Sequence, residues 1–566
     1  MIRQQGGQSI GCGINYRASL VRSGQDARPG EAELRHALPR TRPAEPSNMG
    51  AGFTVGPTGA GRWDQEECMA QIIAEVSRTF NEYLLLPNRT RTDCRPAAVD
   101  LRTPLVRHRA GEASAIELHA PFASAIMQAV SSPELAIALA RNGGLSFIHH
   151  NQSIEEQAAA VRKVKNFKAG FVTSDTNVRP DDSLRDLVGL MGRTGHSTAA
   201  VTHDGSATGR LLGLVTSRDF HPQRHDLEGP VSGRMTAVGD LPHAGVDVTL
   251  SEANARLWEE RLDCLPVLDD EGHLQHLVFR SDYADNKRFP NQVVDADKRL
   301  RVGAGVNTHD YRDRVPALLE AGADVLCFDS SDGYSDWQAE ALTWTKKHYP
   351  EIPIGGGNVV DGEAFTFLAE AGADFVKIGV GGGSICITRD QKGIGRGQAS
   401  AVLDVAAARD AFLERTGDYV PLCSDGGLVE DYHVALALAM GADFVMMGRY
   451  FARFDQAPGA KIPTRDGFVK EYWGEGSNRA RNWQRYGQGG QGLVFEEGVD
   501  GYVPYAGDLN EGLATTIAKI KSTMVSCGSV TLPEFQSSAR LTLVSEQSLQ
   551  ESHASVALRD TSGTVA

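Results

Sequence analysis

Three segments of the chain share one alternation of helical and apolar runs. They span Glu320–Asp329, Glu370–Gly379 and Met440–Gly448, and each carries Gly-Ala-Asp followed by apolar residues. The glycine is suited to end a helix, because it adopts the left-handed conformation without strain. The compact apolar run after it is typical of a strand buried on both faces. Repetition of helix, glycine turn and buried strand predicts an α/β fold with a parallel sheet.

The apolar runs end at glycines or acidic residues, which places polar groups at one edge of the predicted sheet. The predicted strand ends lie near Gly303, Asp329, Gly355, Gly379, Asp425 and Gly448. In a (β/α)8 TIM barrel the loops at the carboxyl ends of the strands build the active site. We therefore favour a (β/α)8 barrel, although a doubly wound sheet gives similar local signals and several of these glycines could simply make turns.

A different internal repeat interrupts the barrel pattern between residues 171 and 288. Gly213–Phe220 is matched by His276–Tyr283, and a strand and turn precede each copy. Two units of about 60 residues predict a tandem module with pseudo-twofold symmetry. The barrel is then expected in two parts, residues 66–170 and 289–530, on either side of this module.

The ends of the chain and one internal stretch lack clear periodicity. Residues 1–65 are rich in Gly, Arg, Pro and Ser, and we expect a disordered extension rather than a targeting signal. Residues 450–505 place aromatic and basic side chains in a polar, Gly-rich stretch, which favours a mobile flap over a solvated loop. Residues 531–566 are expected to form a C-terminal tail.

Composition narrows the class of protein. Of the 566 residues, 41% are hydrophobic and 23% are charged, as in soluble globular proteins. No apolar run reaches the roughly 20 residues that span a bilayer, so we expect no membrane partner. A net charge of −15 argues against nonspecific nucleic-acid binding. The eight cysteines form no Cys-x-x-Cys pair, which is typical of a reduced, cytoplasmic protein.

The densest chemical signal is the segment Gly379–Arg389, which directly follows a predicted buried strand. Four glycines there allow backbone N–H groups to approach an anionic or carbonyl ligand. The segment also carries Ser384, Cys386 and Thr388. A cysteine between a glycine-rich turn and Arg389 is suited to act as a nucleophile, and the alternative is a buried structural cysteine at a strand end.

Several separate motifs together resemble the inosine monophosphate dehydrogenases. Gly379–Arg389 is similar to the active-site loop of that family, and the resemblance covers residues 79–544, including the inserted module. The further motifs that carry it are Ser124–Val130, Gly143–His150, Gly303–Gly305, Asp329–Gly333, Cys423–Gly427, Gly448–Arg449 and Arg485–Tyr486. The chance that so many motifs agree without kinship is small.

The resemblance implies NAD-dependent oxidation of inosine 5′-monophosphate (IMP) to xanthosine 5′-monophosphate, the committed step of guanine nucleotide synthesis. The Cys386 thiolate would attack C2 of the purine, hydride would pass to NAD, and water would hydrolyse the resulting thioimidate. The implied catalytic residues are Cys386, Thr388, Arg485, Tyr486 and Glu497. Arg485 is implied as the base that activates water. Because a free guanidinium is a poor base, Glu497 acting through Thr388 is the alternative.

The resemblance also implies two binding subsites and a cation. IMP would be held by Met127, Ser384, Asp425, Gly426, Gly427, Gly448, Arg449, Tyr472 and Glu497. NAD would be held by Asp329, Ser330, Ser331, Trp337, Asn358, Gly379 and Gly381. Potassium would bind the carbonyls of Gly381, Gly383 and Cys386, with a Glu-Gly-Gly segment from a neighbouring subunit of a homotetramer. This chain departs from the pattern there, with Glu551-Ser552-His553.

The inserted module resembles a tandem pair of CBS motifs, a Bateman module, which commonly binds ATP or GTP. The ribose-binding pattern of that family is kept as Thr216 and Asp219, whereas Phe279 replaces the hydroxyl in the second copy. Two alternative functions remain open. One is GMP reductase, a family whose members we expect to lack both the insert and the Arg-Tyr flap. The other is a nucleotide-sensing CBS protein with an inactive barrel.

Overall fold

The computed structural model describes residues 70, 72–167, 170–280, 288–465, 467–480, 495–552 and 554. Contacts divide the chain into a first unit, Met1–Ile73, and a second, Ala74–Ala566, which holds the elements described below. The expectations for residues 1–65 and for Arg485, Tyr486 and His553 fall outside the described residues. Within the described part, no helix is long and apolar enough to cross a membrane.

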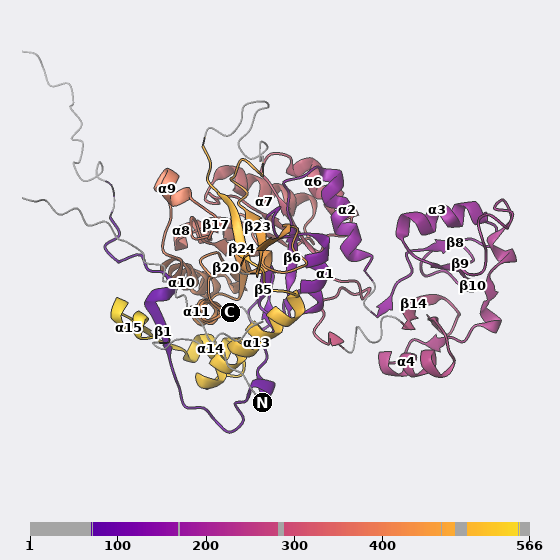
Figure 1. The fold of residues 1–566 in the computed structure, drawn as a ribbon, viewed down its shortest axis with the longest axis horizontal. Coiled ribbons are helices and arrows are strands. Elements are labelled where there is room, and N and C mark those ends of the chain that lie inside the picture. Colours follow the sequence, from indigo (N-terminus) through magenta and orange to yellow (C-terminus); the bar gives the residue numbers. More distant parts are fainter. Residues whose placement is uncertain are drawn as a thin grey trace, which may run out of the picture. The chain divides into compact units, whose positions relative to one another are not determined.

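Eight parallel strands close into a barrel (Figure 1). In barrel order they are β5 (Phe122–Ser124), β6 (Leu145–Ile148), β15 (Gly303–Val306), β16 (Val325–Phe328), β17 (Ile354–Val359), β18 (Phe375–Ile378), β20 (Leu422–Asp425) and β21 (Phe444–Met447). The barrel closes where Met446 of β21 pairs in parallel with Ala123 of β5. The predicted (β/α)8 barrel is thereby confirmed.

Helices follow the strands in sequence and cover the barrel. The principal ones are α1 (Pro133–Arg141), α2 (Ile154–Lys165), α6 (Tyr311–Glu320), α7 (Asp336–His348), α8 (Gly362–Glu370), α10 (Gln398–Thr416), α11 (Asp431–Ala439) and α13 (Leu509–Ser526). After α6, α8 and α11 the repeated glycine takes a positive φ: +93° at Gly322, +102° at Gly372 and +108° at Gly441. The predicted helix–glycine–strand phrase is confirmed at all three positions.

Two predicted strand ends are wrong, because the glycines there begin strands instead. Gly303 is the first residue of β15, and Gly355 is the second residue of β17. A Cβ at Gly355 would lie 2.2 Å from Cζ of Phe375, and one at Gly303 would lie 2.5 Å from Cδ1 of Phe147. These glycines therefore make room for aromatic rings that fill the barrel interior, where Phe375 packs against both Phe147 and Phe444.

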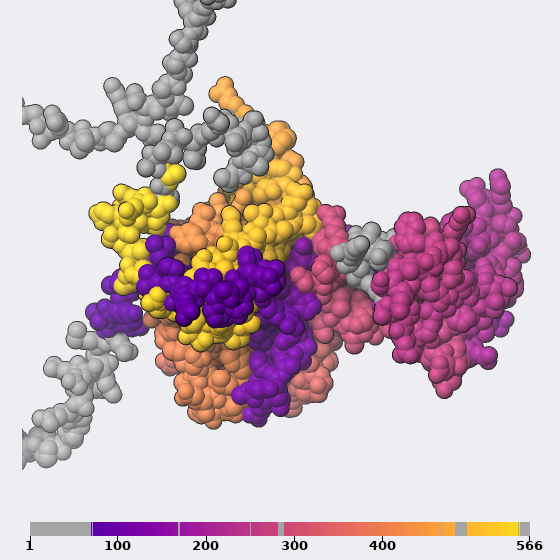
Figure 2. Space-filling model, turned by 90° about the horizontal axis from the view of Figure 1, so that it is seen from below, coloured from indigo at the N-terminus to yellow at the C-terminus, as the bar shows by residue number. Residues whose placement is uncertain are grey.

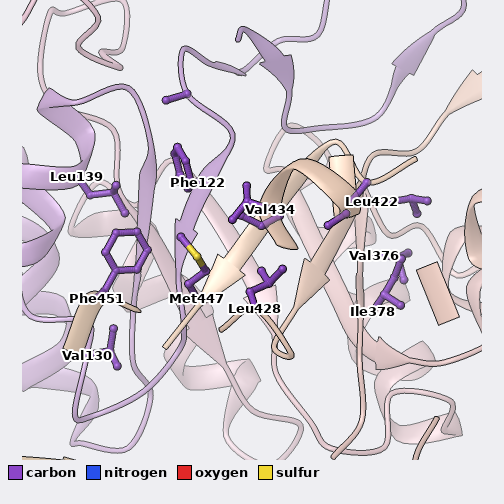
Figure 3. Close-up of a cluster of buried hydrophobic side chains, with 14 of the residues drawn as sticks. Phe122, Val130, Leu139, Val376, Ile378, Leu422, Leu428, Val434, Met447 and Phe451 are labelled. Atoms are coloured by element: carbon purple, nitrogen blue, oxygen red, sulfur yellow. The ribbon is translucent and has the colours of Figure 1, made fainter. Parts of the chain in front are cut away.

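A second core layer lies between the barrel and its helices. It includes Met447 of β21, Val434 of α11 and Phe451 of the short helix α12 (Arg449–Ala452), all nearly fully buried. Figure 3 shows side chains of this layer drawn from strands and helices together. The strands are therefore apolar on both faces, as the sequence pattern predicts for a parallel sheet covered by helices.

The inserted segment forms two four-stranded sheets. One has the order β11-β10-β9-β8 and the other β12-β13-β14-β7. Their strands are β7 (Phe171–Val172), β8 (Asn177–Val178), β9 (Thr198–Thr202), β10 (Leu211–Thr216), β11 (Thr236–Ala237), β12 (Ala244–Gly245), β13 (Cys264–Leu268) and β14 (Leu274–Phe279), with helices α3 (Leu184–Thr194) and α4 (Leu250–Glu259). The two sheets repeat one topology, because β8 and β12 each run parallel to the strand that follows the next helix.

The stretch after the barrel is not the irregular loop that its composition suggests. Residues within it form an antiparallel sheet of β22 (Lys461–Thr464), β23 (Gly467–Trp473) and β24 (Asp500–Pro504). No clear strand pattern is visible in the sequence of β23, because Lys470 and Glu471 stand between its aromatic residues. This sheet carries Tyr472 and Trp473 into the buried interior.

The end of the described chain is also folded. After α14 (Leu532–Ser538), strand β25 (Arg540–Leu543) pairs antiparallel with β1 (Tyr83–Leu86), and α15 (Glu546–Glu551) follows. Figure 2 shows these two ends of the second unit, indigo and yellow, against each other. At the amino-terminal end of the barrel, β2 (Thr103–Pro104) pairs with β4 (Glu117–Leu118), and Leu118 packs into the barrel interior.

Candidate active site

A cleft of about 1060 Å³, including its open mouth, lies at the carboxyl ends of the barrel strands. It brings together most of the residues singled out in the sequence: Met127, Asp329, Ser330, Ser331, Asn358, Gly379, Gly381, Gly383, Ser384, Cys386, Thr388, Asp425, Gly426, Gly427, Gly448, Arg449, Tyr472 and Glu497. These residues come from positions more than 350 apart in the chain, and the barrel together with the sheet β22-β23-β24 collects them at one end.

The loop after β18 bends because its glycines permit backbone conformations closed to other residues. Gly379 has φ +139° and Gly381 has φ +70°. A Cβ on Gly379 would lie 2.2 Å from the carbonyl oxygen of Asp425, so only glycine fits there. Asn358 Nδ2 donates to the Gly379 carbonyl at 2.7 Å, and Arg389 donates to the Val380 carbonyl at 3.2 Å. These bonds hold the loop that presents Cys386.

Cys386 belongs to a short hydrogen-bonded chain that ends in a carboxylate. Its Sγ lies 3.1 Å from Thr388 Oγ1, and that hydroxyl donates to Glu497 Oε2 at 3.0 Å. Because Thr388 has a single hydroxyl hydrogen, the Cys386 thiol must be the donor in the first bond. Backbone bonds join the two segments as well, since Ile387 N donates to the Glu497 carbonyl at 2.9 Å. The arrangement is suited to move a proton from sulfur toward the carboxylate.

Lys377 is a central residue of the site that the sequence reasoning missed. Its Nζ donates to Asp329 Oδ1 at 2.7 Å, to Asn358 Oδ1 at 2.7 Å and to Asp425 Oδ2 at 2.9 Å. Burial by itself lowers the pKa of the ammonium, but the charges of Asp329 and Asp425 outweigh it and hold that pKa well above its usual value. A lysine within the apolar strand Phe375–Ile378 was the available signal, because a buried lysine is rare unless paired.

Another part of the cleft is formed by residues at the ends of β21 and β23. A Cβ on Gly448 would lie 2.6 Å from the Tyr472 hydroxyl and 3.0 Å from Met127 Sδ, so the glycine allows these two side chains to meet. The Tyr472 hydroxyl donates to Met127 Sδ at 3.7 Å, and burial raises the pKa of Tyr472. Arg449 follows at the start of α12, half-buried. A guanidinium at this place can bind an anion bidentately.

Glu475 is a second residue that the sequence reasoning missed. It lines the cleft, and its Oε1 accepts a hydrogen bond from Gln128 N at 2.5 Å. Trp473 Nε1 donates to Gln128 Oε1 at 2.9 Å, which joins β23 to the loop after β5. Glu475 sits in a polar stretch with no periodicity, so nothing in the sequence distinguished it from a solvated glutamate.

One predicted site residue, Trp337, lies outside the cleft. Trp337, at the start of α7, is 74% exposed and lies beside Tyr334 and Phe367 in a separate hollow. Arg485 and Tyr486 fall outside the described residues, so their expected role in the flap stays a prediction.

Comparisons with known proteins place this architecture in a family. The family model of the IMP dehydrogenase / GMP reductase domain matches residues 77–555. An inosine-5′-monophosphate dehydrogenase from Tritrichomonas foetus is 56% identical over 485 residues, which cover 85% of this chain and 96% of that protein. The inosine-5′-monophosphate dehydrogenase of Escherichia coli K12 is 36% identical, covering 85% of this chain and 96% of that protein.

A solved structure is similar over almost the same extent. A GMP reductase from Trypanosoma brucei, crystallised with guanosine 5′-monophosphate, superposes with a TM-score of 0.70 at 28% identity and covers 88% of this chain and 100% of that one. A match over 88% of the chain must include part of the 171–288 insert. The expectation that reductases lack the insert is therefore wrong, and the insert does not separate the two activities. From the family model and these relatives together, the chain belongs to the IMP dehydrogenase / GMP reductase family.

Proposed function

We propose that the chain oxidises IMP to xanthosine 5′-monophosphate with NAD, through a covalent bond between Cys386 and the purine. The observation that carries the proposal is the Cys386–Thr388–Glu497 chain at the mouth of the barrel, with bonds of 3.1 and 3.0 Å. It places a nucleophile, a hydroxyl and a carboxylate in one line inside the cleft. The dehydrogenase relatives, 56% identical in one case, support the same reaction.

The first step makes use of the proton path from sulfur to carboxylate. Passing the thiol proton through Thr388 toward Glu497 leaves a thiolate, which adds to C2 of the hypoxanthine ring. The adduct then loses hydride from C2 to the nicotinamide ring and becomes a thioimidate. NAD supplies the hydride acceptor. Asp425 and the glycines at 426 and 427 line the part of the cleft suited to the ribose and phosphate of IMP, with Ser384, Arg449 and Tyr472.

The dinucleotide would lie on the other side of Lys377, along Asp329, Ser330 and Ser331, which line the same cleft. Asn358 bonds both to the loop carbonyl of Gly379 and, at 2.9 Å, to Asp425. It therefore orients the Cys386 loop relative to the Asp425 carboxylate, which would bind the substrate ribose. The exposed Trp337 has an open face that a dinucleotide base can stack on.

The second step hydrolyses the thioimidate and needs a base for water. Water adds to C2, the thiolate leaves, and the product carries the new oxygen. Glu497 is nearly buried and hydrogen-bonded to Thr388, and it is a suitable base once the thiol proton that it took up in the first step has passed to solvent. Arg485 with Tyr486 is the other candidate. An Arg485→Lys variant that forms NADH in one burst and then turns over slowly would favour the arginine, and unchanged turnover would exclude it.

A potassium ion fits the same loop. The Gly383 carbonyl accepts one hydrogen bond, from Cys386 N at 3.1 Å, and keeps a second lone pair for a cation. The carbonyls of Gly381 and Cys386 would complete the set from this chain, with residues of a neighbouring subunit in a homotetramer. The ion would hold the loop in its reactive shape. A steady-state rate that depends on potassium and not on lithium tests this.

Formation of NADH from IMP tests the reaction directly. Absorbance at the NADH wavelength should rise with IMP and NAD, and the intact mass of the quenched enzyme should show a nucleotide adduct on Cys386. GMP reduction is the second candidate reaction, because the Trypanosoma reductase shares this fold. The proposal is overturned in favour of the reductase if GMP causes loss of NADPH absorbance while IMP and NAD give neither NADH nor an adduct on Cys386.

The inserted module is proposed to bind ATP or GTP as a CBS pair. Thr216 and Phe279 occupy equivalent positions, each the last residue of its strand and paired with the first residue of the preceding one. Asp219 Oδ2 accepts from Thr216 Oγ1 at 2.9 Å, so the two ribose-binding candidates lie together. One nucleotide site, in the first unit of the module, is therefore favoured over two. If the module alone binds nucleotide and Cys386 forms no adduct, the chain is a nucleotide sensor.

A further inference from the structure

The two halves of the cleft share a single buried cation. Lys377 extends from β18 at the centre of four neighbouring strands, β16, β17, β18 and β20, and its side chain is only 1% exposed. Its partners Asp329 and Asp425 are 25% and 19% exposed, so each carboxylate keeps an open side toward the cleft. The ammonium lies beneath both carboxylates and contacts each of them.

The two aspartates depend on this ammonium for their position. Oδ1 of Asp329 and Oδ2 of Asp425 lie 2.7 and 2.9 Å from the same nitrogen. Two carboxylates this close repel each other, and the ammonium between them offsets the repulsion. Asn358 donates to the same Oδ2 of Asp425 at 2.9 Å, and its own Oδ1 accepts from Lys377. Removing the cation therefore leaves two facing carboxylates in a partly dry cleft.

We propose that Lys377 is a positioning residue that couples the IMP half of the site to the NAD half, by holding the carboxylates of Asp425 and Asp329 in place at once. This inference rests on the proposed function, which assigns one ribose to each aspartate. A direct consequence is that, once Lys377 is removed, the charge at Asp329 on the dinucleotide side affects IMP binding at Asp425. Two aspartates held by separate cations would not communicate in this way.

The test is a double-mutant experiment on IMP binding, measured by calorimetry without NAD. Lys377→Met should weaken IMP binding about ten- to a hundredfold, as expected when a charge-assisted hydrogen bond is lost and a buried charge is left unpaired. Adding Asp329→Asn to that variant removes the opposing charge and should restore most of the IMP affinity. Asp329→Asn alone should change IMP affinity by less than about threefold, because Lys377 still holds Asp425.

Another buried lysine provides a matched control. Lys165 is 3% exposed and joins Asp295 and Asp324, each at 2.8 Å, outside the cleft. Lys165→Met should lower the melting temperature and leave IMP affinity unchanged. If Lys377→Met does not fold, Lys377→Gln keeps a hydrogen-bond donor without the charge and should give the same pattern.

Each outcome bears on a different claim. A wild-type enzyme that binds no IMP contradicts the proposed function and not the role of Lys377. A wild-type enzyme that binds IMP, together with a Lys377→Met variant of equal affinity, overturns the inference. The inference is also overturned if adding Asp329→Asn to Lys377→Met lowers the IMP affinity further instead of restoring it. That result would indicate a general loosening of the site.

Discussion

Thr388 donates its hydroxyl hydrogen to Glu497 Oε2 at 3.0 Å, although the two residues are 109 positions apart in the chain. Thr388 begins α9 (Thr388–Lys392), directly after the Cys386 loop, and Glu497 precedes β24. Lys392 Nζ lies 3.6 Å from the same carboxylate oxygen, which keeps a positive charge beside it. The carboxylate is thus aligned with the nucleophile by two segments that the sequence separates widely.

We expect Glu497→Gln to separate oxidation from hydrolysis. The amide cannot accept the proton released by water, so steady-state turnover should fall roughly a hundredfold, the usual size of a general-base contribution. A burst of NADH should still form, because hydride transfer does not consume water, but it should form more slowly, because the amide cannot take up the thiol proton either. Rapid-mixing absorbance measurements distinguish the two phases. Unchanged steady-state turnover would assign hydrolysis to Arg485 instead.

Replacing Cys386 by serine should abolish the adduct and the turnover together. A serine hydroxyl is a far weaker nucleophile than a thiol near neutral pH, and we expect a loss of at least about a thousandfold. IMP binding should persist, because the phosphate and ribose contacts come from other residues. Calorimetry with IMP and intact mass after turnover measure the two effects. Full activity in the serine variant would contradict covalent catalysis by Cys386.

Gly355→Ala should destabilise the barrel without touching the chemistry. The added Cβ would lie 2.2 Å from Cζ of Phe375, whose ring is fully buried against Phe147 and Phe444. Overpacking of this kind costs about 1–3 kcal/mol, which thermal denaturation can detect. Gly192→Ala in α3 is the control, since no atom lies within 4 Å of its Cβ position. A second change, Phe375→Leu, should recover part of the loss at Gly355.

Stability should fall as the pH drops from about 6.5 toward 4. Burial lowers the pKa of His433 to about 4, and its Nδ1 accepts from Val429 N at 3.1 Å. The unfolded chain therefore binds a proton at His433 below about pH 6.5, whereas the folded chain binds it only at about pH 4. The free energy of unfolding consequently decreases as the pH falls through this window. His149, whose pKa burial lowers to about 3, acts with the same sign. Denaturant midpoints at pH 8, 6 and 5 should decrease, and less steeply in a His433→Gln variant.

Asp219→Ala should remove nucleotide binding by the inserted module and leave Cys386 chemistry intact. Thr216 N and Oγ1 both donate to Asp219 Oδ2, at 2.6 and 2.9 Å, so the pair is already arranged at the end of β10. ATP or GTP should raise the melting temperature of the wild-type chain and not that of the variant. An equal rise in both would place the nucleotide elsewhere.

The strand–helix alternation was readable in the sequence, because burial on both faces and a glycine at each helix end are local requirements. The segments ending at Asp329, Gly379 and Gly448 therefore became β16, β18 and β21 as predicted. Asp329, Gly379, Asp425 and Gly448 were placed at the mouth by the same reasoning, since the carboxyl ends of parallel strands share one edge. Met127, Tyr472 and Glu497 were identified only through the resemblance to a known family.

What only the tertiary structure decided depends on contacts between distant segments. Gly303 and Gly355 resemble turn glycines in the chain, yet each faces a phenylalanine ring of another strand. Lys377 is an unexpected charge in an apolar strand of the sequence, and only the folded structure brings Asp329 and Asp425 to its ammonium. Local pattern determines which residues form strands and where the chain turns. Closure of the barrel determines which side chains meet, because it joins strands whose pairing no local spacing encodes.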